Sequence, residues 1–313
     1  MLETRLPEPG ERRRPEPGDA LPPGASGFSK RTPRHGFSER RPRSSRGMDD
    51  LSTELSRRGF DVLAPFRVSW YNEYIQKLGL ATDENHVAGS AFTLTPLPNL
   101  GQEDALALIV GNSKAMWPNM LRWLKSQPNP TVVRDPVDTF SSEVISAAIS
   151  SFAAATDGRP AIAHDMFWAS DMSAARLVDM NRAAYVSGAC YFCDEMCLSI
   201  HPTFGTWVAF RAVVVLDLPG SQLGPAPALL PPLLTDEEKA AAKVAFAEAL
   251  KASSEADMSV HGMPLDIAQK WAAMRDCVGI GREYQYDDSQ SEYHYTKNPE
   301  ILVAALAALD AEG

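Results

Sequence analysis

The stretch Leu198-Ser-Ile-His-Pro-Thr-Phe-Gly-Thr-Trp-Val-Ala-Phe-Arg-Ala-Val-Val-Val-Leu216 decides the fold class of this chain. Its second half, residues 208–216, is a run of β-branched and aromatic residues, which predicts a buried strand. Arg211 interrupts that apolar run. Because a guanidinium keeps its charge and is rarely buried without a partner, Arg211 is expected either to face a bound anion or to close an internal salt bridge.

The pattern around this stretch predicts two strands in succession, Ala183–Cys193 and Met196–Leu216, separated by Asp194 and Glu195. That spacing is typical of a β-hairpin. Hairpin strands mixed with helices favour an α+β fold with a mainly antiparallel sheet flanked by helices. The other predicted strands are Ala91–Leu97, Ala105–Gly111 and Ala161–Trp168, and the predicted helices are Leu51–Gly59, one from Asn112 to Ser126, Asp138–Thr156, Thr235–Ser253 and Pro299–Leu309.

Composition narrows the class of protein. The chain has 313 residues and a net charge of −10, and it contains no apolar run near the ~18 residues that span a bilayer. Four cysteines, three of them between residues 190 and 197, do not resemble a secreted disulfide framework. We therefore expect a cytoplasmic protein with neither a membrane nor a nucleic-acid partner.

The chain divides into four expected segments. Residues 1–47 are rich in arginine and proline and poor in large apolar residues, which predicts a disordered basic tail. Residues 48–218 are expected to form the core, the Pro-rich residues 219–234 a linker, and residues 235–313 a C-terminal helical cap. A targeting role of the tail stays open. The acids in this segment count against a transit peptide, because transit peptides are poor in acids.

Several separated blocks resemble the cobalamin-processing proteins of the methylmalonic aciduria and homocystinuria type C family. They follow in the family's order and cover about residues 55–310. The blocks are Phe66–Glu73, Asp135–Asp138, Ala183–Tyr191, Ile200–Gly205, Tyr284–Asp288 and Tyr293–Tyr295. The connection at Asp194-Glu195 is shorter than the family's. The resemblance implies a flavin-reductase (nitroreductase-like) core with a C-terminal cap.

The resemblance also implies a set of binding residues. Block-to-block matching places the family's cobalamin-contacting positions on Asp165, Val178, Asp179, Met180, Asn181, Phe192, Cys193, Asp194, Ser199 and Phe210. Two of these depart from the family's pattern: Asp194 stands where glutamine is usual, and Ser199 where cysteine is frequent.

Arg211 matches a glutathione-binding arginine of the family. Arg275 or Arg282 is a candidate for the second such arginine, whereas the third aligns near Ile301, which cannot bind an anion. How tightly glutathione binds therefore stays open.

The function that the resemblance implies is cobalamin (vitamin B12) processing and trafficking. The protein would bind alkyl- and cyanocobalamin with the lower base released and remove the upper ligand, by glutathione-dependent dealkylation or by decyanation with a reduced FMN or FAD. The alternatives are a cobalamin-binding chaperone with little turnover and a flavin oxidoreductase of small acceptors. A cblD-type adaptor and methionine synthase are the expected partners, and the protein would be a monomer or a ligand-induced homodimer.

No protein ligand to a metal is predicted. Cys190, Cys193 and Cys197 would need a fourth ligand to hold a metal, so they are interpreted as structural thiols, with a redox role as the alternative. Tyr185 stands where the family has histidine, and the Glu84-x-His86-x-x-Gly89 motif lies in a polar loop. His201 is expected to hold the turn at Gly205 rather than to bind cobalt.

Overall fold

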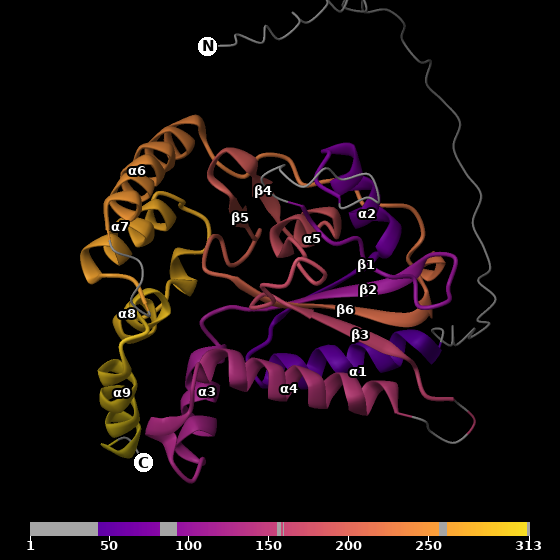
Figure 1. Ribbon diagram of the computed structural model, residues 1–313, viewed down its shortest axis with the longest axis horizontal. Coiled ribbons are helices and arrows are strands. Elements are labelled where there is room, and N and C mark those ends of the chain that lie inside the picture. Colours follow the sequence, from indigo (N-terminus) through magenta and orange to yellow (C-terminus); the bar gives the residue numbers. More distant parts are fainter. Residues whose placement is uncertain (1–42, 82–92, 155–157, 159, 257–261, 312–313) are drawn as a thin grey trace, which may run out of the picture. The chain divides into compact units, whose positions relative to one another are not determined.

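A four-stranded sheet forms the core of the computed structural model, which describes residues 43–81, 93–154, 158, 160–256 and 262–311 (Figure 1). Its strands are ordered β1 (Val62–Arg67), β2 (Ala105–Asn112), β6 (Ala209–Pro219) and β3 (His164–Trp168), and every neighbouring pair is antiparallel. A separate hairpin pairs β4 (Tyr191–Cys193) with β5 (Leu198–Ile200). The predicted α+β class, with an antiparallel sheet flanked by helices, is confirmed.

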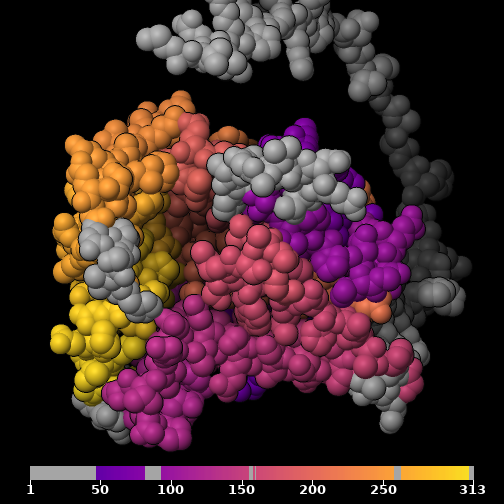
Figure 2. Space-filling view, in the orientation of Figure 1, coloured from indigo at the N-terminus to yellow at the C-terminus, as the bar shows by residue number. Residues whose placement is uncertain are grey.

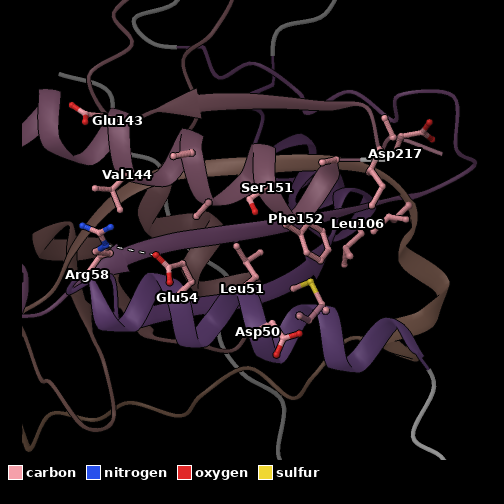
Figure 3. Close-up of a pocket in the computed structure, with 18 of the residues that line it drawn as sticks. Asp50, Leu51, Glu54, Arg58, Leu106, Glu143, Val144, Ser151, Phe152 and Asp217 are labelled. Carbon is pink, nitrogen blue, oxygen red and sulfur yellow. Dashed lines mark ion pairs between the residues drawn. The ribbon is translucent and has the colours of Figure 1, made fainter. Parts of the chain in front are cut away.

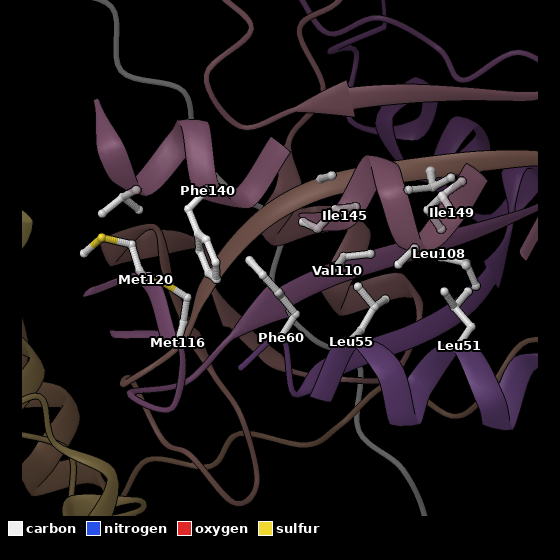
Figure 4. Close-up of a cluster of buried hydrophobic side chains, with 14 of the residues drawn as sticks. Leu51, Leu55, Phe60, Leu108, Val110, Met116, Met120, Phe140, Ile145 and Ile149 are labelled. Carbon is white, nitrogen blue, oxygen red and sulfur yellow. The ribbon is translucent and has the colours of Figure 1, made fainter. Parts of the chain in front are cut away.

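Both faces of the two central strands are buried. Along β2, Leu106 and Leu108 belong to one apolar cluster, whereas Ala107 and Ile109 belong to another on the opposite face. Strand β6 alternates in the same way, because successive side chains of a strand point to opposite faces. The helices that pack on the first face are α1 (Arg43–Arg57), α3 (Met116–Lys125) and α4 (Pro136–Ala153), and those on the second are α2 (Val68–Lys77) and α5 (Met180–Val186) (Figures 1 and 4).

The predicted helices begin and end close to where their sequence signals stand. Helix α4 begins at Pro136, in the first helical turn, where proline's missing N–H costs nothing. Helix α6 (Asp236–Glu255) begins with a capping box, in which Glu238 N donates to Thr235 Oγ1 and Thr235 N donates to Glu238 Oε2. The predicted strand Ala105–Gly111 and the helices from Asn112 to Ser126 and over Pro299–Leu309 are confirmed as β2, α3 and α9 (Pro299–Ala311).

The predicted strand Ala183–Cys193 is wrong over most of its length. Residues Met180–Val186 form helix α5, and only the last three residues of the predicted strand form β4. The helix is favoured because the Asp179 carboxylate accepts a hydrogen bond from Arg182 N and caps its N-terminus, and because alanines, good helix formers, occupy its middle.

The long strand Met196–Leu216 is also wrong as one element, because a turn divides it into β5 and β6. His201 Nδ1 accepts hydrogen bonds from the backbone N–H groups of Thr203 and Phe204, at 3.1 and 3.2 Å. The expectation that His201 holds this turn is confirmed. The predicted hairpin over the same region survives as β4 and β5, which the single helical turn Asp194–Met196 connects.

The predicted strand Ala91–Leu97 is not formed in the part that the structure describes, which begins at residue 93. Leu94 makes one isolated bridge with Ala81. Pro96 and Pro98 explain this outcome, because proline cannot donate a hydrogen bond to a neighbouring strand.

Four helices follow the sheet: α6, α7 (Leu265–Asp276), α8 (Asp288–Thr296) and α9. Their apolar contacts with the hairpin form a third cluster, in which Met196 and Ile200 pack against Ala242 and Met274. In Figure 2 the orange surface of α6 and α7 meets the dark red surface of the hairpin, and yellow α9 lies beside magenta α3. Helix α1 begins at Arg43, within the segment expected to be a disordered tail, and the division of the chain into tail, core, linker and cap stays a prediction.

The turn after β5 and the segment after α7 interlock through two glycines. Gly205 has φ +58°, and a Cβ added there would lie 1.8 Å from the backbone oxygen of Ile280. Gly281 has φ +77°, and its added Cβ would lie 2.2 Å from the backbone carbon of Phe204. Two backbones can approach this closely only where neither residue has a side chain.

None of the helices in the described segments is both long and apolar enough to cross a membrane.

Candidate functional site

A cavity of about 480 Å³ lies between the α5 region, the β4–β5 hairpin, the start of β6 and the C-terminal helices. We call it the hairpin cavity. Its wall combines apolar and polar side chains in nearly equal measure, and the polar groups of such a site can fix the orientation of a small molecule. The residues that line it are Leu94, Ala169, Leu177, Val178, Asp179, Met180, Asn181, Cys197, Leu198, Ser199, Thr206, Val208, Ala209, Phe210, Arg275 and His294.

The structure brings six of the ten predicted cobalamin-contacting residues together in this wall: Val178, Asp179, Met180, Asn181, Ser199 and Phe210. Ser199 Oγ donates a hydrogen bond of 2.9 Å to Asn181 Oδ1, which ties the hairpin to α5. Asp179 N donates to the hydroxyl of the buried Tyr71 at 3.0 Å. These contacts fix the polar part of the wall.

The other four predicted residues lie outside the lining of this cavity, and their role stays a prediction. Asp194 is in the hairpin turn, 2.8 Å from Arg182 Nη2, and Phe192 lies under the same guanidinium, 5.1 Å from ring centroid to Cζ. Cys193 is buried against the C-terminal helices. Asp165 on β3 pairs with Arg176, at 3.0 Å from Oδ1 to Nη2.

Arg211 makes one internal hydrogen bond to a neutral amide and one loose ion pair, and whether it also faces a bound anion stays a prediction. Its Nε donates to Asn112 Oδ1 at 2.7 Å, while its Nη1 lies 3.8 Å from Asp138 Oδ1. The Arg211 side chain is 13 % exposed, but that of Asp138 is 53 % exposed. A pair at that distance with a solvated carboxylate stabilises little. Burial lowers the pKa of Arg211, which still stays charged at neutral pH.

Arg275 is a buried cation held by neutral groups. It is 7 % exposed, its Nε donates to the Thr206 carbonyl at 3.0 Å, and its Nη2 donates to the same oxygen. Its Cζ lies 4.6 Å from the ring centroid of Trp207 and 5.0 Å from that of Tyr286. Within the described segments no carboxylate forms an ion pair with Arg275, so its charge is available to an anion in the cavity.

Two functional candidates were missed from the sequence, His294 and Lys297. His294 lines the hairpin cavity, and Lys297 follows α8 with its Nζ 5.5 Å from the ring centroid of Tyr293. Burial, with the neighbouring charges of Arg275, Lys297 and Arg211, holds the pKa of His294 well below its usual value. We call Arg211, Arg275 and Lys297 the cation cluster.

The structure separates the two candidates for a second anion-binding arginine. Of the two candidates for a second arginine, Arg275 faces the cavity, whereas Arg282 is exposed in a helical turn after α7. Ile301 packs against the first apolar cluster of the core. Burial and the charge of Arg211 lower the pKa of Lys297. A signal for His294 did exist, in the tyrosine-rich block Tyr293–Tyr295.

The cysteines lie in different surroundings. Cys190 belongs to the apolar cluster on the α2–α5 face of the sheet, whereas Cys193 belongs to the third cluster. Burial raises the pKa of Cys190 to about 12, so its thiol is unreactive at neutral pH. Cys197 is exposed.

Tyr185, which stands where the family has histidine, makes an edge-on contact with Tyr74, with ring centroids 5.7 Å apart.

The described residues contain no group of three or more His, Cys, Asp or Glu side chains arranged to hold a metal ion. The Glu84-x-His86-x-x-Gly89 motif lies outside the described residues.

A larger cavity of about 920 Å³ runs between α1 and α4 (Figure 3). Four carboxylates border it, on Asp50, Glu54, Glu143 and Asp217, and Glu54 pairs with Arg58 at 3.6 Å. None of the predicted binding residues lines this groove, which lies on the other face of the sheet from the hairpin cavity. The candidate site is therefore the hairpin cavity.

Comparison with known proteins identifies one family by sequence and one similar fold by structure. Residues 59–225 match the model of the methylmalonic aciduria and homocystinuria type C family. The chain is similar to the crystal structure of a C. elegans B12-trafficking protein, CblC, a homologue of human MMACHC, with 16% identity and a TM-score of 0.55 over 83% of this chain and 95% of that one. At this identity the likeness shows a shared fold. No curated protein sequence matches the chain.

Two structures of epoxyqueuosine reductase are less similar. The enzyme from Bacillus subtilis has 11% identity and a TM-score of 0.40, over 82% of this chain and 70% of that one. A complex with a tRNA-Tyr stem loop has 12% identity and a TM-score of 0.41 over the same shares of the two chains. These values are too low to indicate a common function.

Proposed function

Because the chain belongs to the methylmalonic aciduria and homocystinuria type C family, we propose that it binds alkylcobalamins in the hairpin cavity and transfers their upper ligand to glutathione. Membership of this family supports a role in cobalamin processing. The observation that supports the finer proposal is that predicted residues of both kinds meet at one cavity. Six predicted cobalamin-contacting residues and the predicted Arg275 line it, and the charges of Arg211 and Lys297 act on His294 in the same wall.

The cavity suits part of a cobalamin. Pockets of ~300–1,000 Å³ enclose drug-sized ligands, and cobalamin is larger than these, so a cavity of about 480 Å³ would hold one region of it and leave the rest outside. Val178, Leu198 and Phe210 offer an apolar wall to the flat corrin, and Asn181 and Ser199 offer hydrogen bonds to its amide arms.

The cation cluster suits a peptide with two carboxylates and a thiol. Arginine and lysine bind carboxylates through charge-assisted hydrogen bonds, and nearby positive charge raises the thiolate fraction of a thiol. In the proposed reaction the thiolate attacks the alkyl carbon and a C–S bond forms. The Co–C bond breaks with its electron pair on cobalt, which leaves cob(I)alamin and a thioether.

Reductive decyanation is a second activity that the same cavity could support. The corrin would keep the wall of Val178, Leu198 and Phe210 in this reaction, and the flavin would have to reach it from the open side of the cavity. A reduced FMN or FAD would supply the electrons that release cyanide from Co(III). We place both activities in the cytoplasm, where thiols stay reduced. A cblD-type adaptor, methionine synthase and a ligand-induced homodimer stay predictions from the resemblance.

The absorption spectrum after mixing with methylcobalamin tests the function directly. The enzyme should shift the spectrum to the base-off form and then, only when glutathione is added, convert it to that of reduced cobalamin. A base-off shift without conversion would favour the chaperone. An unchanged spectrum would favour a flavin oxidoreductase of small acceptors and would contradict our proposal.

Arg211→Gln tests the anion-binding role of the cluster. We expect the affinity for glutathione to fall ~10- to 100-fold, because one charge-assisted contact worth ~1.5–3 kcal/mol is lost, while cobalamin binding stays nearly intact. Isothermal titration with each ligand measures both. The matched control is Asp138→Asn, which removes the loose ion-pair partner of Arg211 and should leave glutathione affinity within ~3-fold. If Arg211→Gln instead lowers the melting temperature and its folded fraction binds glutathione normally, the arginine is structural.

A further inference from the structure

His294 is a cavity-lining histidine whose ring is fixed by aromatic contacts alone. Its ring centroid lies 5.8 Å from that of Tyr286 and 4.8 Å from that of Tyr295, both edge-on. Neither ring nitrogen makes a hydrogen bond to any residue that the structure describes. The two tyrosines therefore orient the ring while leaving both nitrogens to a ligand in the hairpin cavity.

The charges around His294 come from several elements. Arg275 on α7 lines the same cavity, and the charges of Arg211 on β6 and of Lys297 after α8 also lower the pKa of His294. Asp138 on α4 acts on Arg211 and Lys297, and the two tyrosines are the other titratable groups that touch the ring. In this surrounding the imidazole is neutral at pH 7 and keeps a lone pair.

We propose that His294 accepts the thiol proton of the peptide that the cation cluster holds, a role that rests on the glutathione-dependent reaction proposed above. The S–H bond breaks and its proton moves to a ring nitrogen of His294. The sulfur electron pair forms the bond to the alkyl carbon, the Co–C pair stays on cobalt, and the imidazolium returns its proton to water. Neutral imidazole beside a thiol is the pairing that activates sulfur nucleophiles generally.

The same three cations explain why the base would act only when the peptide is bound. In the free protein they oppose a fourth positive charge on the ring. A peptide with two carboxylates bound to Arg211, Arg275 or Lys297 cancels part of this potential, so the ring becomes more basic once the thiol is in place. An empty cavity would leave the histidine neutral.

The experiment compares the full-length wild-type chain with His294→Gln from pH 6.5 to 9.5. The rate of glutathione-dependent demethylation of methylcobalamin is followed by absorption. At pH 7 the variant should be ~100-fold slower, within the range of general-base catalysis. By pH 9.5 the gap should narrow to within ~3-fold, because a thiol of pKa ~8.5 ionises without help. Because burial lowers the pKa of Lys297 in both proteins, the ratio of the two rates is the quantity compared.

Binding supplies a readout that does not depend on activity. S-methylglutathione has the carboxylates of the substrate but no S–H, so its affinity for His294→Gln, measured by isothermal titration, should stay within ~2-fold of wild type. His164→Gln is the matched control, because His164 lies on β3 outside the cavity lining and should change neither the rate nor the affinity.

The outcomes separate this role from the function it rests on. A rate gap that is the same at every pH, together with weaker S-methylglutathione binding, would make His294 a structural neighbour of the cluster and overturn the proposal. Normal rates in the variant would overturn it as well, with the dealkylation reaction left standing. A wild-type chain that binds cobalamin but never demethylates it would remove both.

Discussion

Gly205→Ala is expected to lower the free energy of unfolding by ~3–5 kcal/mol. The alanine would hold its φ of +58° at a cost of ~1–2 kcal/mol, because an L side chain in this region crowds its own carbonyl. Its Cβ would also lie 1.8 Å from the backbone oxygen of Ile280, so one of the two interlocked segments has to move. Effects of this size come from few mechanisms, and backbone strain with a forced shift is one of them.

Gly79→Ala is the matched control, because Gly79 at the C-terminal end of α2 has φ +68° but no atom within 4 Å of an added Cβ. It should cost only the ~1–2 kcal/mol of the backbone conformation. Urea unfolding followed by tryptophan fluorescence gives both values. Equal losses in the two variants would mean that the close approach of Gly205 to Ile280 does not contribute. A larger loss at Gly205 should be accompanied by weaker cobalamin binding, since the shift would move Thr206 and Arg275.

Phe60→Ala should have an effect of similar size, ~3–5 kcal/mol, for a different reason. Phe60 is fully buried in the cluster of Figure 4 and stacks on Phe140 with ring centroids 5.7 Å apart. Truncation removes its buried surface and leaves a cavity that a packed core cannot close. The control is Phe152→Ala on α4, whose ring is only partly buried at the edge of the same cluster and should lose ~1–2 kcal/mol.

Cobalamin binding by the same variant tests whether the two faces of the sheet act independently. Phe60 belongs to the face opposite the hairpin cavity, so the folded fraction of Phe60→Ala should bind cobalamin as the wild type does. Weaker binding by folded protein at a temperature well below its melting point would show that the α1–α4 face supports the cavity.

The parts of the fold that could be predicted are those with strong local signals. Strand β2 is a continuous apolar run, α6 begins with a capping box, and α4 carries a proline at its first position. The antiparallel pairing of β4 with β5 also followed from local spacing, because a connection of a few residues forces two strands to run in opposite directions. The neighbours in the four-stranded sheet are joined by long connections, which carry no such signal.

The errors occurred where tertiary contacts override local preference. Alanine and tyrosine around residue 185 were read as strand, but the Asp179 cap and the packing of α5 against the sheet make a helix. The turn at His201 was predicted as a turn, yet the strand was continued through it, since the contact that bends it, Gly205 against Ile280, joins residues far apart in sequence.

The site shows the same limit. Val178 to Asn181 and Phe210 were placed by matching blocks, and the structure puts them on one wall. His294 and Lys297 were not predicted, because their role depends on the charges of Arg211 and Arg275, which belong to two other elements. A single histidine or lysine in a polar segment has no pattern of its own. Only the fold shows that the charges of three cations act on one ring.

Because both faces of β2 and β6 are buried, insertions and deletions in these strands have a different effect from those in the loops. One residue inserted into β6 would exchange its two sets of side chains, so Val213 and Val215 would enter the cluster of Leu216. Because each set packs in its own cluster, the length of these strands is as constrained as their composition. The turn at Asp194-Glu195 lies outside the sheet, so a deletion there leaves both sets of side chains on their own faces.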